Sequence, residues 1–106
     1  MSGEEILKKT LEDNKAVIFS KSWCPYCRRA VSILENADVD HLVYDLEEEV
    51  DGDAVHDAVA AIAGRTSVPQ TFIAGKLLGG CDDLTAAKDS GDLAKLLDEA
   101  GLSHNL

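Results

Sequence analysis

The sequence of 106 residues has no apolar run that approaches the ~20 residues needed to cross a bilayer. Its first residues, Met1–Glu5, lack the basic flank and apolar stretch of a secretory signal. No repeat, low-complexity tract or linker interrupts the chain, and 45% of its residues are hydrophobic, which suits one ordinary core. We therefore expect a single domain over 1–106, without a membrane segment, in the cytoplasm. An organellar form left after removal of a targeting segment stays open.

Positive charge is scarce, with 10 Lys and Arg against 20 Asp and Glu and a net charge of −10. This balance argues against nucleic acid or an anionic membrane as a partner. Acidic residues are themselves absent from Asn14 to Leu34, where Lys21, Arg28 and Arg29 lie. The acidic run at Glu47–Glu49 is typical of a solvated face. The basic island is more informative, because it indicates a place that binds negative charge.

Cysteine is also scarce, and three residues cannot all be paired in a structural disulfide framework. Cys24 and Cys27 form a C-x-x-C, which in this context indicates either a redox pair or part of a metal site. Zinc needs four ligands and usually a second closely spaced pair, which Cys81 and the three histidines do not supply. We expect no metal, a redox role for Cys24 and Cys27, and ordinary surface positions for the histidines.

Apolar spacing and turn residues predict the order helix, strand, helix, strand, helix, strand, strand, helix, helix. The predicted segments are a helix over 3–12, a strand over 16–19, a helix from 25 to 36–38, a strand over 41–44, a helical stripe at Val55, Ala58, Val59 and Ile62 closed by Gly64, a hairpin over 71–78 that turns at Ala74-Gly75, and two C-terminal helices broken at Ser90-Gly91. Strands joined through a helix are expected to be parallel, and the hairpin adds an antiparallel pair. We predict an α/β fold with a mixed four-stranded sheet and helices on both faces.

Cys24 lies where the first strand leads into a helix that begins at Pro25. An ordinary cysteine is only about 3% thiolate at pH 7, and the N–H groups and dipole of a helix N-terminus favour the anion. Lys21 and Arg28 would add positive potential. We therefore expect Cys24 to be the exposed nucleophile. Cys27, one turn deeper, would be the poorly accessible thiol that resolves a mixed disulfide.

Three segments, in this order, resemble the glutaredoxin family. They are Lys21–Cys27, which contains C-P-Y-C; Gly64–Ile73, which is similar to the family's T-V-P loop but has Ser67 where Thr is more usual; and Gly79–Leu84, which matches its G-G-C-D-D-L turn. The predicted elements around them cover essentially the whole chain. The resemblance implies a thioredoxin-like fold and a glutathione site.

By that resemblance, the glutathione-binding residues would be Lys21, Tyr26, Arg65, Ser67, Val68, Pro69, Gly80, Cys81 and Asp82. Val68 would pair its backbone with the tripeptide, next to a cis Pro69. Cys81 and Asp82 would receive the γ-glutamyl end. Lys21 and Arg65 would face the glycyl carboxylate, unless they are ordinary surface residues. A buried structural role is the alternative for Cys81.

The function implied is that of a monomeric, glutathione-dependent thiol–disulfide oxidoreductase, with glutathione as cosubstrate and no tightly bound cofactor. Its other substrates would be glutathionylated or disulfide-containing proteins, and a separate NADPH-dependent glutathione reductase would recycle the glutathione disulfide. Thioredoxins are one alternative, but their usual pair is C-G-P-C and they lack a glutathione pocket. The other alternative is a glutathione-ligated iron–sulfur cluster carrier, which Pro25 disfavours in this family.

Overall fold

The computed structural model describes residues 1–106, and its helices and strands follow the predicted order. The elements are α1 (Gly3–Asp13), β1 (Ala16–Ser20), α2 (Pro25–Asn36), β2 (Leu42–Asp45), α3 (Gly52–Ala63), β3 (Gln70–Ile73), β4 (Lys76–Gly79), α4 (Cys81–Ser90) and α5 (Asp92–Ala100). The second strand is shifted by one residue from its predicted place, and α3 begins three residues before the predicted stripe. None of these helices combines the length and apolar character needed to cross a bilayer.

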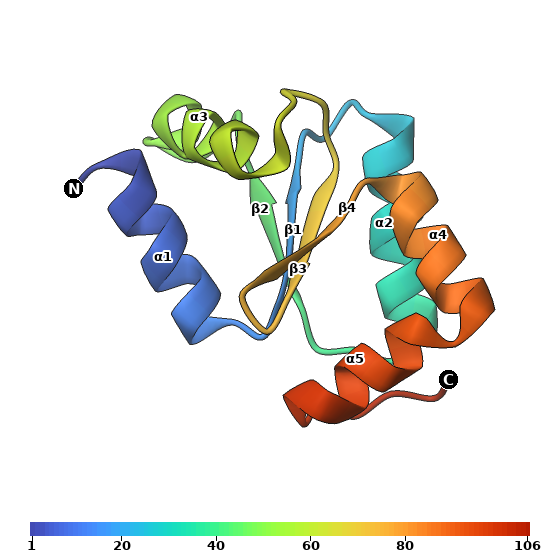
Figure 1. Cartoon of the computed structure of the whole chain (residues 1–106). Coiled ribbons are helices and arrows are strands. Elements are labelled where there is room, and N and C mark those ends of the chain that lie inside the picture. Colours follow the sequence, from blue (N-terminus) through green and yellow to red (C-terminus); the bar gives the residue numbers. More distant parts are fainter.

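The strands form one mixed sheet in the order β2-β1-β3-β4 (Figure 1). β1 and β2, which are connected through α2, are parallel, whereas β3 is antiparallel to both β1 and β4. The hairpin turns at Ala74 and Gly75 with positive φ at both residues, 51° and 78°, as a two-residue hairpin turn requires. The predicted mixed four-stranded sheet is therefore confirmed.

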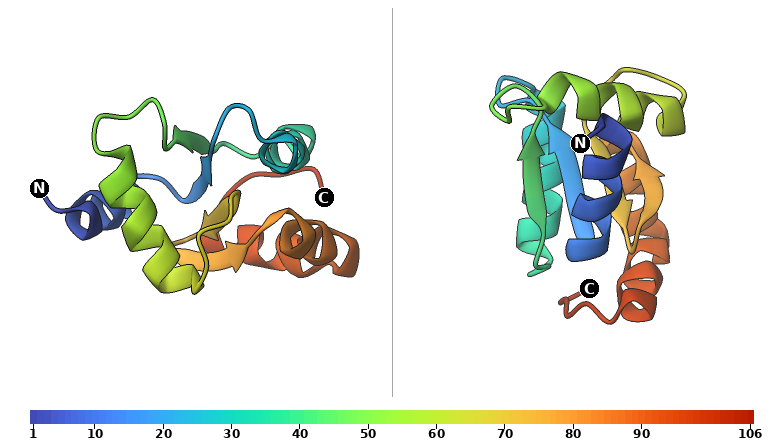
Figure 2. Two further views of the ribbon diagram at one scale, coloured as in Figure 1. Left: turned by 90° about the horizontal axis from the view of Figure 1, so that it is seen from above. Right: turned by 90° about the vertical axis from the view of Figure 1, so that its left-hand side faces the viewer.

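Helices cover both faces of the sheet, and β1 lies buried between the two layers (Figures 1 and 2). Ala16 and Ile18 point into a core shared with α2, α4 and α5. Val17 and Phe19 point into a second core shared with α1 and α3. The burial of this strand on both faces follows from the two-residue period of strand side chains, which places alternate residues in the two cores. The buried β1 provides a rigid support for the turn that carries Cys24.

One residue of the predicted stripe on α3 is not in the core. Val55, Ala58 and Val59 are buried, but Ile62 is 54% exposed. The helices α1 and α3 meet near their N-terminal ends, where Gly3 contacts Ala54, and their axes then diverge (Figures 1 and 2). Ile62 lies in an open depression that Leu7 and Leu11 of α1 also line, so its side chain stays in contact with solvent. The spacing of apolar residues along α3 cannot indicate this.

Candidate functional site

The sulfur of Cys24 caps the N-terminus of α2. Cys24 occupies the N-cap position with Pro25 directly after it, and its Sγ accepts a hydrogen bond from the Cys27 backbone N–H at 3.3 Å. The turn before it is closed by the Cys24 N–H, which donates to the Lys21 carbonyl at 3.0 Å. No acidic residue lies in the first turn of α2. Backbone N–H groups and the helix dipole therefore act on this sulfur in the direction that stabilises a thiolate.

Cys24 is not exposed, contrary to the sequence-based expectation. Only 4% of the residue is accessible. Its Sγ lies between the Cys27 N–H and the carbonyl of Val68, to which the thiol donates at 3.8 Å. The cover comes from a loop 44 residues further along the chain. A disulfide substrate must therefore dock closely against this loop before its sulfur reaches Cys24.

Cys27 lies deeper, as predicted, and is 2% exposed. Burial raises the pKa of its thiol to about 12, and the hydrogen bond with Cys24 adds to the increase. Cys27 is therefore a protonated thiol at neutral pH. Of the two cysteines, only Cys24 lies at a helix N-terminus with its sulfur accepting a backbone N–H.

The loop Arg65–Val68, between α3 and β3, is fixed by side chains from several elements. On one side, His56 of α3 lies with its Nε2 2.8 Å from the Thr66 carbonyl. On the other, the buried side chain of Gln70 donates through Nε2 to the Ser67 carbonyl at 3.1 Å. Both bonds are made to backbone oxygens, so they fix the path of the loop.

The ends of the same loop are attached to the two helices that carry the cysteines. Arg65 Nη2 lies 3.4 Å from Asp83 Oδ2 of α4, and the same oxygen accepts from the Gly80 N–H at 3.0 Å. At the other end, the Val68 carbonyl accepts from the Cys24 thiol, and the Val68–Pro69 peptide is cis. The loop therefore connects the N-termini of α2 and α4.

A cavity of about 170 Å³ opens beside this loop. Its lining consists of Tyr26, Arg65, Ser67, Val68, Pro69, Gly80, Cys81, Asp82 and Asp83. Every predicted glutathione residue except Lys21 is present. Lys21 lines a separate cavity together with Cys27 and Arg28. Lys21 and Arg65 therefore line different cavities, and Arg65 has the Asp83 carboxylate as an ionic partner.

Unpaired backbone groups surround the cavity. No hydrogen bond within the chain uses the N–H of Val68, which precedes β3. The N–H groups of Cys81 and Asp82 also have no partner, because they belong to the first turn of α4. An extended peptide could pair with Val68 while its carboxylate accepts from the helix N-terminus.

Aromatic and basic side chains complete the rim. Tyr26 is 55% exposed, and the guanidinium of Arg29 lies 5.3 Å from the centre of its ring. Such a cation–π contact is worth ~0.5–1 kcal/mol at an exposed site. Arg29 thus fixes the ring beside the cavity and adds positive charge in the basic island.

Sequence reasoning gave no role to Asp83, Gln70 or His56, although all three position the loop. Asp83 has a detectable signal, because an acidic residue three positions after a helix-capping glycine can accept from the glycine backbone N–H, as Asp83 does from Gly80. Gln70 and His56 have no such signal in the sequence.

The three histidines are half-buried and hydrogen-bonded rather than ordinary surface residues; the Nε2 of His104, for instance, lies 2.6 Å from Asp98 Oδ1. No group of three or more His, Cys, Asp and Glu side chains could hold a metal ion.

Comparison with known proteins identifies the family. The glutaredoxin family model matches residues 16–78. The chain is 48% identical to glutaredoxin-C4 of Arabidopsis thaliana over 92% of this chain and 72% of that protein. It is 40% identical to glutaredoxin-1 of Rhizophagus irregularis over 86% of this chain and 90% of that one.

Solved structures agree with this assignment. A buckwheat glutaredoxin–glutathione complex superposes with a TM-score of 0.89 at 32% identity, covering 93% of this chain and 90% of that one. Oxidized glutaredoxin 2 from Chlamydomonas reinhardtii gives a TM-score of 0.82 at 43% identity, covering 95% and 98%. The thioredoxin-like fold is therefore confirmed. This chain has a thiol pair at a helix N-terminus, and together with these relatives that feature places it in the glutaredoxin family of glutathione-dependent thiol–disulfide oxidoreductases.

Proposed function

We propose that the protein reduces protein–glutathione mixed disulfides and protein disulfides, with Cys24 as nucleophile and Cys27 as resolving thiol. The observation that carries the proposal is the contrast between the two sulfurs. Cys24 accepts a backbone N–H at the start of α2, whereas burial raises the pKa of Cys27 to about 12. The thiolate needed for attack on a disulfide therefore belongs to Cys24.

For a glutathionylated protein, the Cys24 thiolate attacks the glutathionyl sulfur. A Cys24–glutathione disulfide forms, the original sulfur–sulfur bond breaks, and the protein leaves as a thiolate that takes up a proton. A second glutathione thiolate then attacks the glutathionyl sulfur on Cys24. This step regenerates the Cys24 thiolate and releases glutathione disulfide, which a separate NADPH-dependent reductase reduces. The protein needs no tightly bound cofactor for this cycle.

For a protein disulfide, Cys24 forms a mixed disulfide with one of the two protein sulfurs. Cys27 then loses its proton and attacks the Cys24 sulfur, which gives the Cys24–Cys27 disulfide and the second protein thiol. The backbone N–H of Cys27 lies 3.3 Å from the Cys24 sulfur, which supports this intramolecular step. Two glutathione molecules restore the dithiol.

Glutathione would occupy the cavity beside the Arg65–Val68 loop. Its central peptide would pair with Val68, and its γ-glutamyl carboxylate would accept from the free N–H groups of Cys81 and Asp82. Tyr26 would flank the sulfur. Lys21 would contribute positive charge from a separate cavity, which it lines together with Cys27.

The test is turnover of a glutathionylated peptide in the presence of glutathione, glutathione reductase and NADPH. We expect Cys24→Ser to have no activity and Cys27→Ser to retain it. With a protein disulfide as substrate, Cys27→Ser should lose activity as well. Thermal unfolding of both variants controls for folding. No turnover by the wild-type protein would refute the proposal and favour the iron–sulfur carrier, and reduction of protein disulfides by Cys27→Ser would refute the resolving role.

A further inference from the structure

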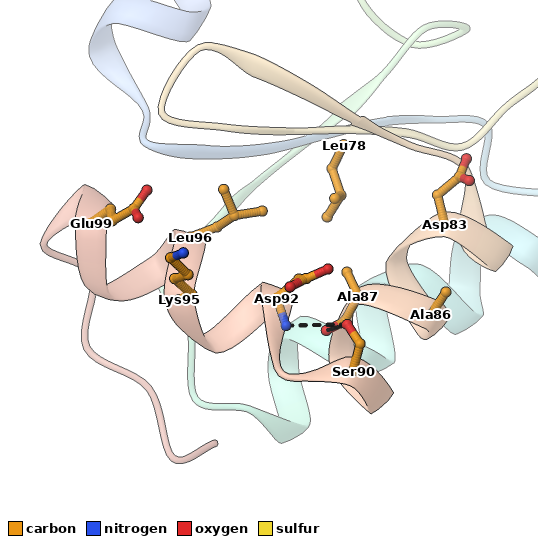
Figure 3. Close-up of a pocket in the computed structure, with 9 residues that line it drawn as sticks. All are labelled: Leu78, Asp83, Ala86, Ala87, Ser90, Asp92, Lys95, Leu96 and Glu99. Carbon is orange, nitrogen blue, oxygen red and sulfur yellow. Dashed lines mark hydrogen bonds between the residues drawn. The ribbon is translucent and has the colours of Figure 1, made fainter.

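A second and larger depression, of about 670 Å³, lies between β4 and the helices α4 and α5. Figure 3 shows Leu78 pointing from β4 toward the two helices, with Asp83 and Glu99 at opposite ends. The apolar part of its lining consists of Leu78, Ala86, Ala87 and Leu96. Because β4 is the edge strand, no further strand closes this side. We call this depression the α4–α5 groove.

The polar rim of the groove is mostly acidic. Asp83, Asp92 and Glu99 contribute carboxylates, and Lys95 contributes the one positive charge. Asp92 and Glu99 are exposed and form no ion pair, either with Lys95 or with any other residue. The groove therefore combines an apolar floor with two carboxylates that form no ion pair.

The groove adjoins the proposed glutathione site at Asp83, which lines both cavities. From Asp83, the α4 part of the groove extends to Ser90, about 10 Å at 1.5 Å per residue. About three residues of extended chain cover that distance at ~3.3 Å each. A segment of this length on a client protein could lie there while glutathione occupies the neighbouring cavity.

We propose that the α4–α5 groove binds a basic and apolar segment of the glutathionylated client protein. The charge complementarity selects lysine or arginine at the rim, and the apolar floor selects an aliphatic side chain between β4 and the helices. A second copy of this chain is a poor occupant, because two molecules with a net charge of −10 repel each other. This inference rests on the proposed function and specifies its substrate class.

The test compares three S-glutathionylated peptides of equal length, in which a Lys-Leu, Glu-Leu or Lys-Ser pair follows the modified cysteine at three to five residues. The mixed disulfide of glutathione with 2-mercaptoethanol is the fourth substrate and lacks any segment for the groove. An exposed ion pair contributes ~0.2–1 kcal/mol, so two carboxylates predict a roughly two- to thirtyfold higher kcat/KM for Lys-Leu than for Glu-Leu. Lys-Ser should be slower than Lys-Leu.

The groove variant combines Asp92→Asn with Glu99→Gln, and the matched control combines Glu47→Gln with Glu48→Gln. Both remove two negative charges at exposed positions, but Glu47 and Glu48 lie outside the groove in the segment after β2. The groove variant should bring the Lys-Leu to Glu-Leu ratio close to one and leave the 2-mercaptoethanol disulfide unaffected. The control should keep the wild-type ratio.

Several outcomes would overturn the inference. A groove variant with the wild-type ratio would show that the groove does not select the client. An equal loss of preference in the control would assign the selection to overall charge. Equal rates for all three peptides in the wild type would exclude a client segment from the groove. Failure of the wild type to turn over even the 2-mercaptoethanol disulfide would instead refute the proposed function itself.

Discussion

Gly79 and Gly80 are adjacent, yet the structure predicts opposite consequences for their replacement by alanine. Gly79 has a φ of 122°, in a region that side chains with a Cβ rarely adopt. A Cβ at this position would also overlap the Asp83 carboxylate. Gly80 has an ordinary φ of −80°, and the nearest atom to a Cβ there is the Pro69 carbonyl oxygen at 3.6 Å.

For Gly79→Ala, backbone strain would cost ~1–3 kcal/mol. The displaced Asp83 side chain would no longer accept from the Gly80 N–H, and loss of such a cap costs typically ~1 kcal/mol. The sum is about 2–4 kcal/mol. For a domain of this size, that corresponds to a decrease in Tm of roughly 10–30 °C.

For Gly80→Ala, we expect a Tm close to that of the wild type, because alanine adopts this backbone conformation without strain. Its methyl group, however, would add volume to the wall of the proposed glutathione cavity. Overfilling a packed contact costs ~1–3 kcal/mol, which corresponds to a roughly 5- to 150-fold increase in KM for a glutathionylated peptide.

The assay is thermal unfolding followed by circular dichroism, together with kinetics for both variants and the wild type. A large decrease in the Tm of Gly80→Ala would mean that the second glycine is also required by the fold. A folded Gly80→Ala with the wild-type KM would refute the placement of glutathione against this residue.

Three further predictions follow from the contacts described above. Asp83→Asn should destabilise the protein by less than ~1 kcal/mol, because it removes an exposed ion pair but keeps an acceptor for the Gly80 N–H. Asp83→Ala should cost ~1–2 kcal/mol more, and equal urea midpoints for the two variants would contradict the capping role. In the Cys24→Ser variant, iodoacetamide should alkylate Cys27 negligibly up to pH 9, because the raised pKa of this thiol keeps it protonated until strongly alkaline pH. A pH midpoint for alkylation of Cys27 below 9, measured on the folded protein, would be inconsistent with its burial. Leu93 is a buried residue of α5, and Leu93→Ala should lower the free energy of unfolding, measured by chemical denaturation, by ~2–5 kcal/mol. A decrease below ~1 kcal/mol would indicate that the core rearranges to fill the cavity left by the leucine.

Features determined by neighbouring residues could be predicted from the sequence. Pro25 after Cys24 identified the start of α2, and Gly64 identified the end of α3, where it has the left-handed conformation expected of a C-cap. The turn at Ala74-Gly75 was predicted in the same way. In each case, the backbone preference of one or two residues is sufficient to fix the local conformation.

Features determined by distant contacts could not be predicted in this way. The burial of Cys24 depends on the Val68 carbonyl, and the pairing of Arg65 depends on Asp83. Neither partner is adjacent in the sequence, and periodicity carries no information about which loop covers which helix end. The resemblance to glutaredoxins named residues that line one cavity, but it did not indicate that Lys21 lines a different one.

The attachments of the Arg65–Val68 loop have a consequence for how the site is assembled during folding. They come from α2, α3, β3 and α4, so no fragment that ends before α4 contains all of them. The contact between Cys24 and Val68 spans 44 residues, so the entropy cost of closing this loop must be met before the contact forms. In an incomplete or partly folded chain, Cys24 would lack its cover and Cys27 its burial, and both would react as ordinary thiols. Selective redox chemistry is thus a property of the finished domain rather than of the C-P-Y-C segment.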